Sequence, residues 1–261
     1  MPLRPAELGD GVGAWFSGRD VDAAPVPIGG GGNLAHRRPH RPSELAAARR
    51  AVGSATETDP RTWHLLQQVH GGAVAVVDDR TPAGAELRGV DAAVTTCVER
   101  PLVVQAADCV PVLFAGPGAV GVAHAGRLGV TAGVIAAAVA ALRRLLGSTA
   151  PIRAAVGPAI GPCCYEVPAA LRDEVVASLA ADGPAGIADA ARIAGRTRWS
   201  TPSLDLPTAV RAQLGAAGVQ VTAPTAECTC CDEAWFSHRR DPDSGRQIGL
   251  IVRRADAGVS P

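Results

Sequence analysis

Three side chains that can bind a metal, His70, Cys109 and His124, lie beside short apolar runs of the chain. Cys109 comes just before "VPVLFAG" and His124 lies near the end of "AVGVAHA", two runs that predict buried strands joined by a Gly-Pro turn. His70, in "QQVHGG", lies between a polar turn and an apolar run. Two imidazoles and one thiolate supply three ligands for zinc and leave a fourth position for water or substrate.

The same residues have other interpretations, which the spacing leaves open because no CxxC or HExxH pair fixes two of them on one turn. Each can be a buried thiol or a histidine bonded to a backbone carbonyl. Cys109 could instead be the nucleophile of a cysteine hydrolase with His124 as its base. A copper oxidase is less favoured, because six dispersed histidines supply at most one mononuclear site. Asp108 could shuttle protons or orient a ligand histidine.

Five of the other cysteines form two groups, Cys163-Cys164 and the "CTCC" segment that spans Cys228, Cys230 and Cys231. Seven cysteines are an odd number without a regular spacing, so free thiols or metal ligands are favoured over a disulfide framework. Four thiolates could close a second, structural zinc site. Vicinal cysteines do not readily bind one ion, so packed or pocket-lining thiols are the favoured interpretation.

Composition narrows the classes of partner. The chain has no net charge, its basic residues are all arginines, and these are scattered, so it carries no electrostatic footprint for nucleic acid. A small ligand is favoured. The segment 1–20 lacks the apolar run of a signal peptide, and the Ala-rich segment 130–146 is too short to span a membrane. We therefore expect a cytoplasmic protein with no membrane partner, either a monomer or a homodimer.

Strand and helix patterns alternate along the chain. Val- and Ala-rich runs bounded by Gly, Pro and Asp predict strands at 73–78, 91–96, 101–107, 111–116, 119–125, 152–160 and 245–254. Helical patterns occupy 43–53, with Ser43 as N-cap and Gly53 as its end, and 130–146, 168–181 and 205–218. A Gly- and Pro-rich loop covers 25–42.

These elements predict a mixed α/β (α+β) fold, in which two mixed sheets pack together and helices cover their outer faces. We expect one domain over residues 1–261. A doubly wound parallel sheet is disfavoured, because several predicted strands are joined by connections too short for a crossover helix.

Six motifs occur in the order "QVHG", "DAAVTT", "ADCVPVLF", "AHAG", "GPAIGPCCYEV" and "CTCCDEAWFSHRRD", followed by "GRQIGLI". In this order the chain resembles the YfiH family of laccase-domain, or polyphenol oxidase, proteins over nearly its whole length. The resemblance implies a zinc-dependent purine nucleoside phosphorylase that splits adenosine, inosine, guanosine or methylthioadenosine with phosphate, and adenosine deaminase activity in some members. It also implies that His70, Cys109 and His124 are the zinc ligands.

The chain departs from the family at two places. "HAG" is followed by Arg127-Leu128-Gly129 instead of Trp-Arg-Gly, and an Asn-Arg pair after the first helix appears as Ala48-Arg49. These departures leave a degenerate, non-catalytic binding protein as a further alternative.

Phosphorolysis requires cationic or amide donors that hold phosphate beside the sugar. Arginine suits this task because its planar fork can make two parallel hydrogen bonds to phosphate. Our candidates for substrate binding are Asn33, Arg49, Arg127 and Arg239, of which Arg239 is preferred.

Overall fold

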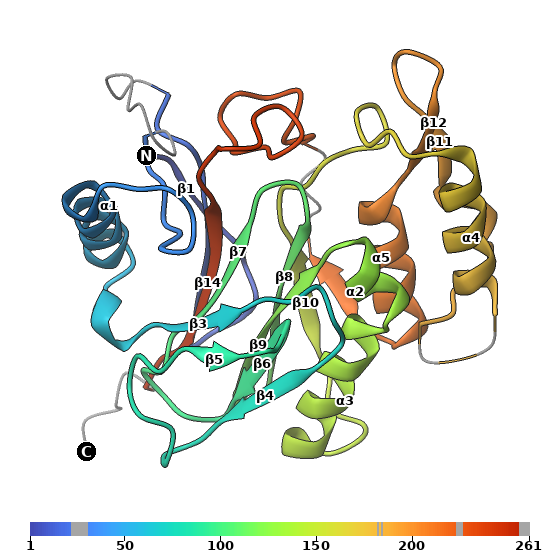
Figure 1. Ribbon diagram of the computed structural model, residues 1–261. Helices are drawn as coiled ribbons and strands as arrows, with labels where there is room; N and C mark the ends of the chain where they lie inside the picture. The colour runs from blue at the N-terminus through green and yellow to red at the C-terminus, as the bar shows by residue number, and fades with distance from the viewer. Residues whose placement is uncertain (22–30, 182, 184, 223–226, 256–261) are drawn as a thin grey trace.

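The computed structural model describes residues 1–21, 31–181, 183, 185–222 and 227–255. Residues 25–30 of the predicted Gly- and Pro-rich loop lie outside this part. Two six-stranded sheets and a two-stranded ribbon form the framework (Figure 1). The first sheet has the order β1 (Leu3–Pro5), β2 (Val12–Ser17), β14 (Gln247–Arg253), β7 (Leu102–Ala106), β3 (His64–Gln67) and β5 (Leu87–Arg88). The second has the order β13 (Gln220–Thr222), β10 (Arg153–Val156), β8 (Val110–Gly116), β9 (Ala119–Ala125), β6 (Ala92–Thr95) and β4 (Val74–Val77).

Both large sheets are mixed. The pairs β3–β7, β3–β5, β4–β6 and β10–β13 are parallel, and the other pairs are antiparallel. The ribbon consists of β11 (Ala194–Arg196) and β12 (Pro202–Leu204). The helices are α1 (Pro42–Ala55), α2 (Arg127–Thr131), α3 (Val134–Leu146), α4 (Ala169–Ala180) and α5 (Leu206–Ala216), with short 3₁₀ turns at Pro60–Thr62 and Ala190–Ile193.

Three apolar clusters hold these layers together. Between the two sheets, Phe16 and Ile251 of the first pack with Leu113 and Val122 of the second. The opposite face of the second sheet packs against α3 and α5. Helix α1 lies against the outer face of the first sheet (Figure 1). The second sheet is thus covered on both faces, which explains why its strands read as continuous apolar runs. The predicted fold class is confirmed.

Strand β8 shows this double burial residue by residue. Val112 and Phe114 belong to the cluster on the helix side, whereas Leu113 and Ala115 belong to the cluster between the sheets. Each of the seven predicted strand segments overlaps an observed strand, although β10 ends at Val156 within the segment predicted over 152–160. The sequence patterns missed strands such as β2 and β3, which pair with strands remote in sequence.

Two predicted helices have different limits in the structure. The helix predicted over 130–146 is two helices, α2 and α3, because Gly133 takes a left-handed conformation with φ of 74° between them. Helix α1 begins at Pro42 with Arg41 as its N-cap, so Ser43 lies inside the helix. Gly53 does not end α1 either, because the helix continues to Ala55.

Among the described residues, no helix combines the length and the apolar character that crossing a membrane requires.

Candidate metal centre

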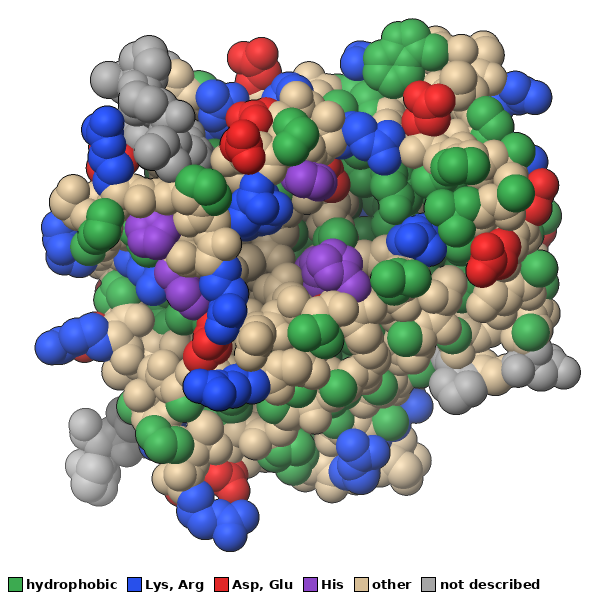
Figure 2. Space-filling view, viewed as in Figure 1, with side chains coloured by type: hydrophobic (Ala, Val, Ile, Leu, Met, Phe, Trp, Pro, Cys, Tyr) green, Lys and Arg blue, Asp and Glu red, His purple; other side chains and the backbone are tan. Residues whose placement is uncertain are grey.

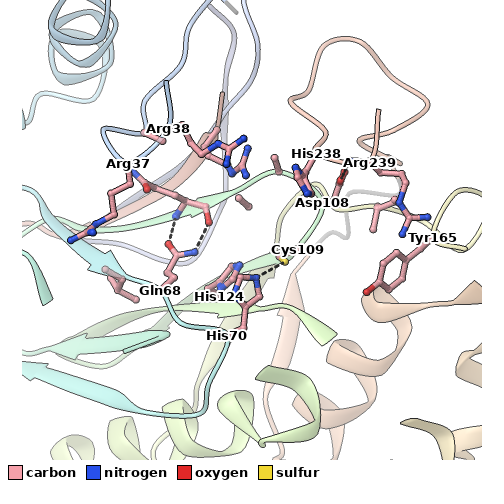
Figure 3. A pocket seen from close by; sticks show the side chains of 17 residues that line it. Arg37, Arg38, Gln68, His70, Asp108, Cys109, His124, Tyr165, His238 and Arg239 are labelled. Atoms are coloured by element: carbon pink, nitrogen blue, oxygen red, sulfur yellow. Dashed lines mark hydrogen bonds between the residues drawn. The ribbon is translucent and has the colours of Figure 1, made fainter. Parts of the chain in front are cut away.

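The β8–β9 hairpin brings Cys109 and His124 together. Its register pairs Pro111 with His124 and Val110 with Ala125, so Cys109 lies at the end of β8 close to the strand that carries His124. His70 approaches from the turn after β3, and its Nε2 lies 3.8 Å from the Sγ of Cys109 (Figure 3). The ligand atoms of these three residues all lie within 4.8 Å of one another. We call this set the histidine–cysteine cluster.

Asp91, which the sequence analysis did not select, holds two members of this cluster in place. The side chain of Asp91 is fully buried just before β6. One carboxylate oxygen, Oδ1, accepts a hydrogen bond from Nδ1 of His124 at 2.8 Å and one from the backbone N–H of His70 at 3.0 Å. The other oxygen accepts from the backbone N–H groups of Val69 and Gly71 at 3.1 and 2.7 Å. With Nδ1 of His124 engaged as the donor, its Nε2 is the nitrogen left for a metal.

Two residues next to this carboxylate network have unusual backbones. His70 has φ of 61° and Asp108 has φ of 91°, in the positive-φ region that residues other than glycine rarely adopt. Such conformations cost about 1–3 kcal/mol each and persist only where surrounding contacts enforce them. The three N–H bonds to Asp91 supply that enforcement at His70.

The electrostatics of the cluster favour an ionised thiol. Burial raises the pKa of the Cys109 thiol, but the charge and hydrogen bonds of His124 and His70 outweigh burial and lower the pKa to about 6. Burial lowers the pKa of His124, whereas Cys109 and Asp91 together raise it to about 9. Near neutral pH the two groups form a thiolate–imidazolium pair. Because a metal binds neutral imidazole, metal binding here would release the imidazolium proton.

Gly126 makes room for the cluster. A Cβ atom at this position would lie 2.8 Å from Cδ2 of His70 and 2.9 Å from Sγ of Cys109. Both separations are shorter than atoms tolerate, so the glycine of "HAG" is required by the close approach of the two side chains.

The donor set of the cluster fits zinc. Zinc binds thiolate sulfur and imidazole nitrogen, and a catalytic site uses three protein ligands with an open fourth position. Magnesium and calcium take oxygen ligands and do not suit these residues. His124 is buried and His70 is exposed, so the cluster reaches from the core to the surface.

The cluster forms one wall of a cavity of about 430 Å³. Figure 2 shows a hollow near the middle of this face, bordered by histidine and arginine side chains. Arginine and histidine side chains that line the cavity include Arg37, Arg38, His238, Arg239 and Arg246. The first four of these are labelled in Figure 3. Tyr165 also lines it, and the guanidinium of Arg239 lies 5.3 Å from the centroid of that ring. The volume is within the range of about 300–1,000 Å³ typical of small-molecule sites.

The cationic side chains differ in their partners. Arg37 forms an ion pair with Glu86 at 2.7 Å. Arg246 donates to the carbonyl oxygens of residues 244 and 245, and Arg38 donates to the carbonyl of residue 242. Within the described part of the chain, no ion pair joins Arg38, Arg239 or Arg246 to a carboxylate. These three therefore bring positive charge to the cavity.

Asp108 lines the cavity, but both of its carboxylate oxygens are engaged. Oδ1 accepts from the hydroxyl of Thr229 at 2.7 Å, and Oδ2 accepts from the backbone N–H of Arg239 at 2.6 Å. This arrangement favours orientation of the loops around the cavity over proton transfer. The Arg239 side chain, in turn, donates to the carbonyls of Cys164 and Glu166.

Three predicted substrate-binding residues are not brought to the cavity wall. Asn33 is buried and its amide oxygen accepts from the backbone N–H groups of Ala35 and Arg246, both at 3.0 Å. Arg49 donates to the carbonyl of Leu34 at 3.0 Å. Arg127 begins α2 and is not among the lining residues. Only Arg239, of the four candidates, lines the cavity.

Several residues that the sequence analysis did not select line the cavity or hold the metal ligands in place. Asp91 stood in the quoted motif "DAAVTT", and Arg246 in "GRQIGLI", but nothing local distinguishes them from other charged residues beside strands. Arg37 and Arg38 lie in the Gly- and Pro-rich loop, where they read as solvated surface charges.

Together, the two packed mixed sheets and the histidine–cysteine cluster that opens into a cationic cavity define a class of protein. The chain belongs to the multi-copper polyphenol oxidoreductase laccase family, whose family model matches residues 14–254.

Named relatives and solved structures agree with this membership. A purine nucleoside phosphorylase of Streptomyces coelicolor is 42% identical over 213 residues, covering 80% of this chain and 83% of that protein. A purine nucleoside phosphorylase of Streptomyces griseus is 40% identical over 212 residues, covering 80% and 82%. The structure of YlmD from Geobacillus stearothermophilus matches with a TM-score of 0.81 at 31% identity, over 98% of both chains. Bacillus licheniformis YfiH matches with a TM-score of 0.84 at 27% identity, over 97% of this chain and 96% of that one. The resemblance drawn from the motifs is confirmed.

Proposed function

We propose that this protein is a zinc-dependent purine nucleoside phosphorylase. It takes adenosine, inosine, guanosine or methylthioadenosine with phosphate and releases the free base and the sugar 1-phosphate. One observation carries the proposal: three zinc-type ligands, His70, Cys109 and His124, meet at the wall of a cavity that is also lined by guanidinium groups. The names of the relatives support the same activity.

The reaction breaks the bond between the sugar C1′ and the purine nitrogen and forms a bond from C1′ to a phosphate oxygen. Phosphate must therefore be held on the face of the sugar opposite the base. Arg38, Arg239 and Arg246 carry no carboxylate partner among the described residues, so their charge is available to an anion. Planar guanidinium forks can each make two hydrogen bonds to phosphate, which fixes its orientation as well as its position.

His70, Cys109 and His124 would hold the zinc ion. When bound, zinc supplies a Lewis acid that can polarise a phosphate oxygen or lower the pKa of water to about 7. Asp91 keeps Nδ1 of His124 as a hydrogen-bond donor and holds the backbone of His70, so the ligands are oriented before metal arrives. The same activation of water is the basis on which we include adenosine deamination as a second activity.

A cysteine hydrolase is the second candidate, because one observation favours it. Cys109 lies beside His124, which is hydrogen-bonded to Asp91, and the lowered pKa of the thiol suits a nucleophile. His70 is a third donor that such a triad does not need, and this favours the metal. A chelator would abolish a zinc-dependent activity. A cysteine hydrolase would stay active in the presence of the chelator and would then be inactivated by iodoacetamide, which alkylates its thiol.

A copper oxidase of phenols receives less support. Multicopper chemistry needs many histidines, and of the two groups of potential metal ligands in the described residues only one contains histidine. A mononuclear blue-copper site with two histidines and one cysteine commonly adds a long axial methionine. The only methionine of the chain, Met1, packs instead with the cluster on the outer face of the first sheet.

The test is product analysis with the zinc-loaded protein. A panel of purine nucleosides is incubated with and without phosphate, and bases, nucleosides and sugar phosphates are separated by chromatography. We expect free base and sugar 1-phosphate in equal amounts, only when phosphate is present, and inosine from adenosine where deamination occurs. Cys109→Ala should lose activity together with the zinc of the histidine–cysteine cluster, whereas Cys97→Ala, which removes a thiol that contacts Asp79 outside the cavity, should change neither. Absence of base release from every nucleoside would refute the proposal and favour a binding protein.

A further inference from the structure

A second set of cysteines comes together outside the cavity. The sulfur atoms of Cys163, Cys164, Cys228 and Cys231 all lie within 4.8 Å of one another. We call this set the four-thiol cluster. It joins two segments remote in sequence, the turn that follows β10 and the "CTCC" segment that precedes β14. Cys230 belongs to the second segment, but its sulfur is not part of the cluster.

The spacing of the sulfurs is close to that of a tetrahedral metal site. The Sγ of Cys231 lies 3.6 Å from that of Cys163 and 3.4 Å from that of Cys164. Four thiolates around zinc at about 2.3 Å place neighbouring sulfurs about 3.8 Å apart. A disulfide requires a separation of about 2.0 Å and would use two of the four thiols.

Both segments are folded as turns that direct their thiols to one point. Cys228 and Cys231 are separated by two residues, the spacing that zinc ribbons and fingers use, and the N–H of Cys231 donates to the carbonyl of Cys228 at 3.0 Å. The other turn is closed by bonds from the N–H groups of Cys164 and Tyr165 to the carbonyl of Gly161, both at 3.0 Å.

The vicinal pair Cys163-Cys164 argued against a shared ion at the level of sequence. In the folded chain both sulfurs already lie within 3.6 Å of Cys231. The turn that carries them therefore allows both to face one point, and the objection is removed by geometry.

The surroundings suit the negative charge of a tetrathiolate site. Zinc with four thiolates carries a net charge of −2, which hydrogen-bond donors and cations must compensate. The backbone N–H of Gly161 donates to the Sγ of Cys228 at 3.2 Å, and a guanidinium nitrogen of Arg198 lies 4.0 Å from the Sγ of Cys231. Cys164 is buried and Cys231 is exposed, so an ion can enter from solvent and be enclosed by the turns.

From these contacts we infer that Cys163, Cys164, Cys228 and Cys231 form a second, structural zinc site. The site clamps two segments that support the cavity. Tyr165, directly after Cys164, lines the cavity, and Thr229, directly after Cys228, donates to the carboxylate of Asp108. The second zinc thus fixes the part of the cavity wall formed by Tyr165 and Asp108 without touching the substrate. The inference does not depend on the reaction that the cavity catalyses.

Zinc content per chain tests the inference. The full chain and its variants are purified under reducing conditions with zinc in the medium, exchanged into metal-free buffer, and analysed by inductively coupled plasma mass spectrometry. Cys109→Ala, which leaves the four-thiol cluster intact, is expected to retain one zinc per chain. X-ray absorption of that variant should show four sulfurs at about 2.3 Å and no nitrogen ligand.

Cys231→Ser should hold one zinc fewer than the wild type. Cys230→Ser is the matched control in the same segment and should keep the wild-type zinc content, because its sulfur lies outside the cluster.

Three results would overturn the inference. The first is a folded Cys109→Ala protein without zinc, and the second is a zinc–nitrogen shell in that variant. The third is a disulfide between any two of the four cysteines in wild-type protein, detected by mass spectrometry after alkylation without reduction. If Cys231→Ser does not fold, the measurements on Cys109→Ala decide the question alone. If the wild-type protein showed no phosphorolysis of any nucleoside, the proposed function would be refuted, but the zinc measurements would still test the four-thiol site.

Discussion

Replacing Asp91 by Asn keeps the shape of a buried side chain but removes its charge and two of its acceptor positions. The carboxylate accepts four hydrogen bonds, two at each oxygen. In Asp91→Asn, the amide nitrogen must face one of these two pairs of donors. If it faces the donors of residues 69 and 71, both N–H groups lose their acceptor. If it faces His124 instead, the imidazole must change its tautomer, and Nε2 then carries a proton where a metal would bind.

The magnitude follows from counting the lost bonds. Hydrogen bonds to a charged group contribute about 1.5–3 kcal/mol each, so losing two lowers the free energy of unfolding by about 3–6 kcal/mol. This is a large part of the total of about 5–15 kcal/mol expected for a domain. Loss of the partner that orients a ligand histidine lowers metal affinity about 10–100-fold. We expect both effects in the Asp91→Asn protein.

Two assays separate these effects. Urea unfolding in the presence of a chelator measures the stability of the metal-free chain, and competition with a chromophoric chelator measures zinc affinity. Asp173→Asn is the matched control, because Asp173 is an exposed carboxylate on α4 that contacts Arg172. If Asp91→Asn unfolded at the wild-type urea concentration and released zinc at the wild-type chelator concentration, the role assigned to Asp91 would be wrong.

Two further changes test the packing and the electrostatics of the chain. Gly126→Ala should lower zinc affinity by at least tenfold, because its Cβ would overlap the side chains of His70 and Cys109. The control is Gly215→Ala, whose added Cβ meets no atom within 4 Å, and it should leave the result of chelator competition unchanged. Burial lowers the pKa of His64 in the folded chain. As the pH falls below about 6.5, this histidine therefore binds a proton in the unfolded chain before it does so in the folded chain. The free energy of unfolding then falls by at most about 1.4 kcal/mol per pH unit. His64→Leu should remove this part of the slope in urea unfolding between pH 7 and 5.5, and an unchanged slope would contradict the assignment.

Local pattern in the sequence was enough to predict most of the fold. The inner strands β8, β9 and β6 of the second sheet are buried on both faces, so their apolar character is continuous and visible without knowledge of their partners. The β8–β9 hairpin is a local structure as well, and for that reason the convergence of Cys109 and His124 could be expected from a short segment. The break at Gly133 could not, because apolar periodicity continues through it.

Tertiary contacts decided what surrounds the metal ligands. Asp91 contacts His124 and the turn at His70 across more than 20 residues of chain, and no local signal marks a carboxylate that will accept four bonds. Asn33 was selected from the sequence as a substrate-binding candidate, and in the structure its amide oxygen accepts from the backbone N–H groups of Ala35 and Arg246.

The four-thiol cluster shows the same division most clearly. The sequence showed a vicinal cysteine pair and a separate group of three cysteines, and the vicinal pair argued against a shared ion. Only folding determined that two turns, separated by more than 60 residues, direct their sulfurs to one point. Residue types and local periodicity determined which chemistry was available to this chain. Which side chains meet depends on the packing of remote segments, and that is set by the whole fold.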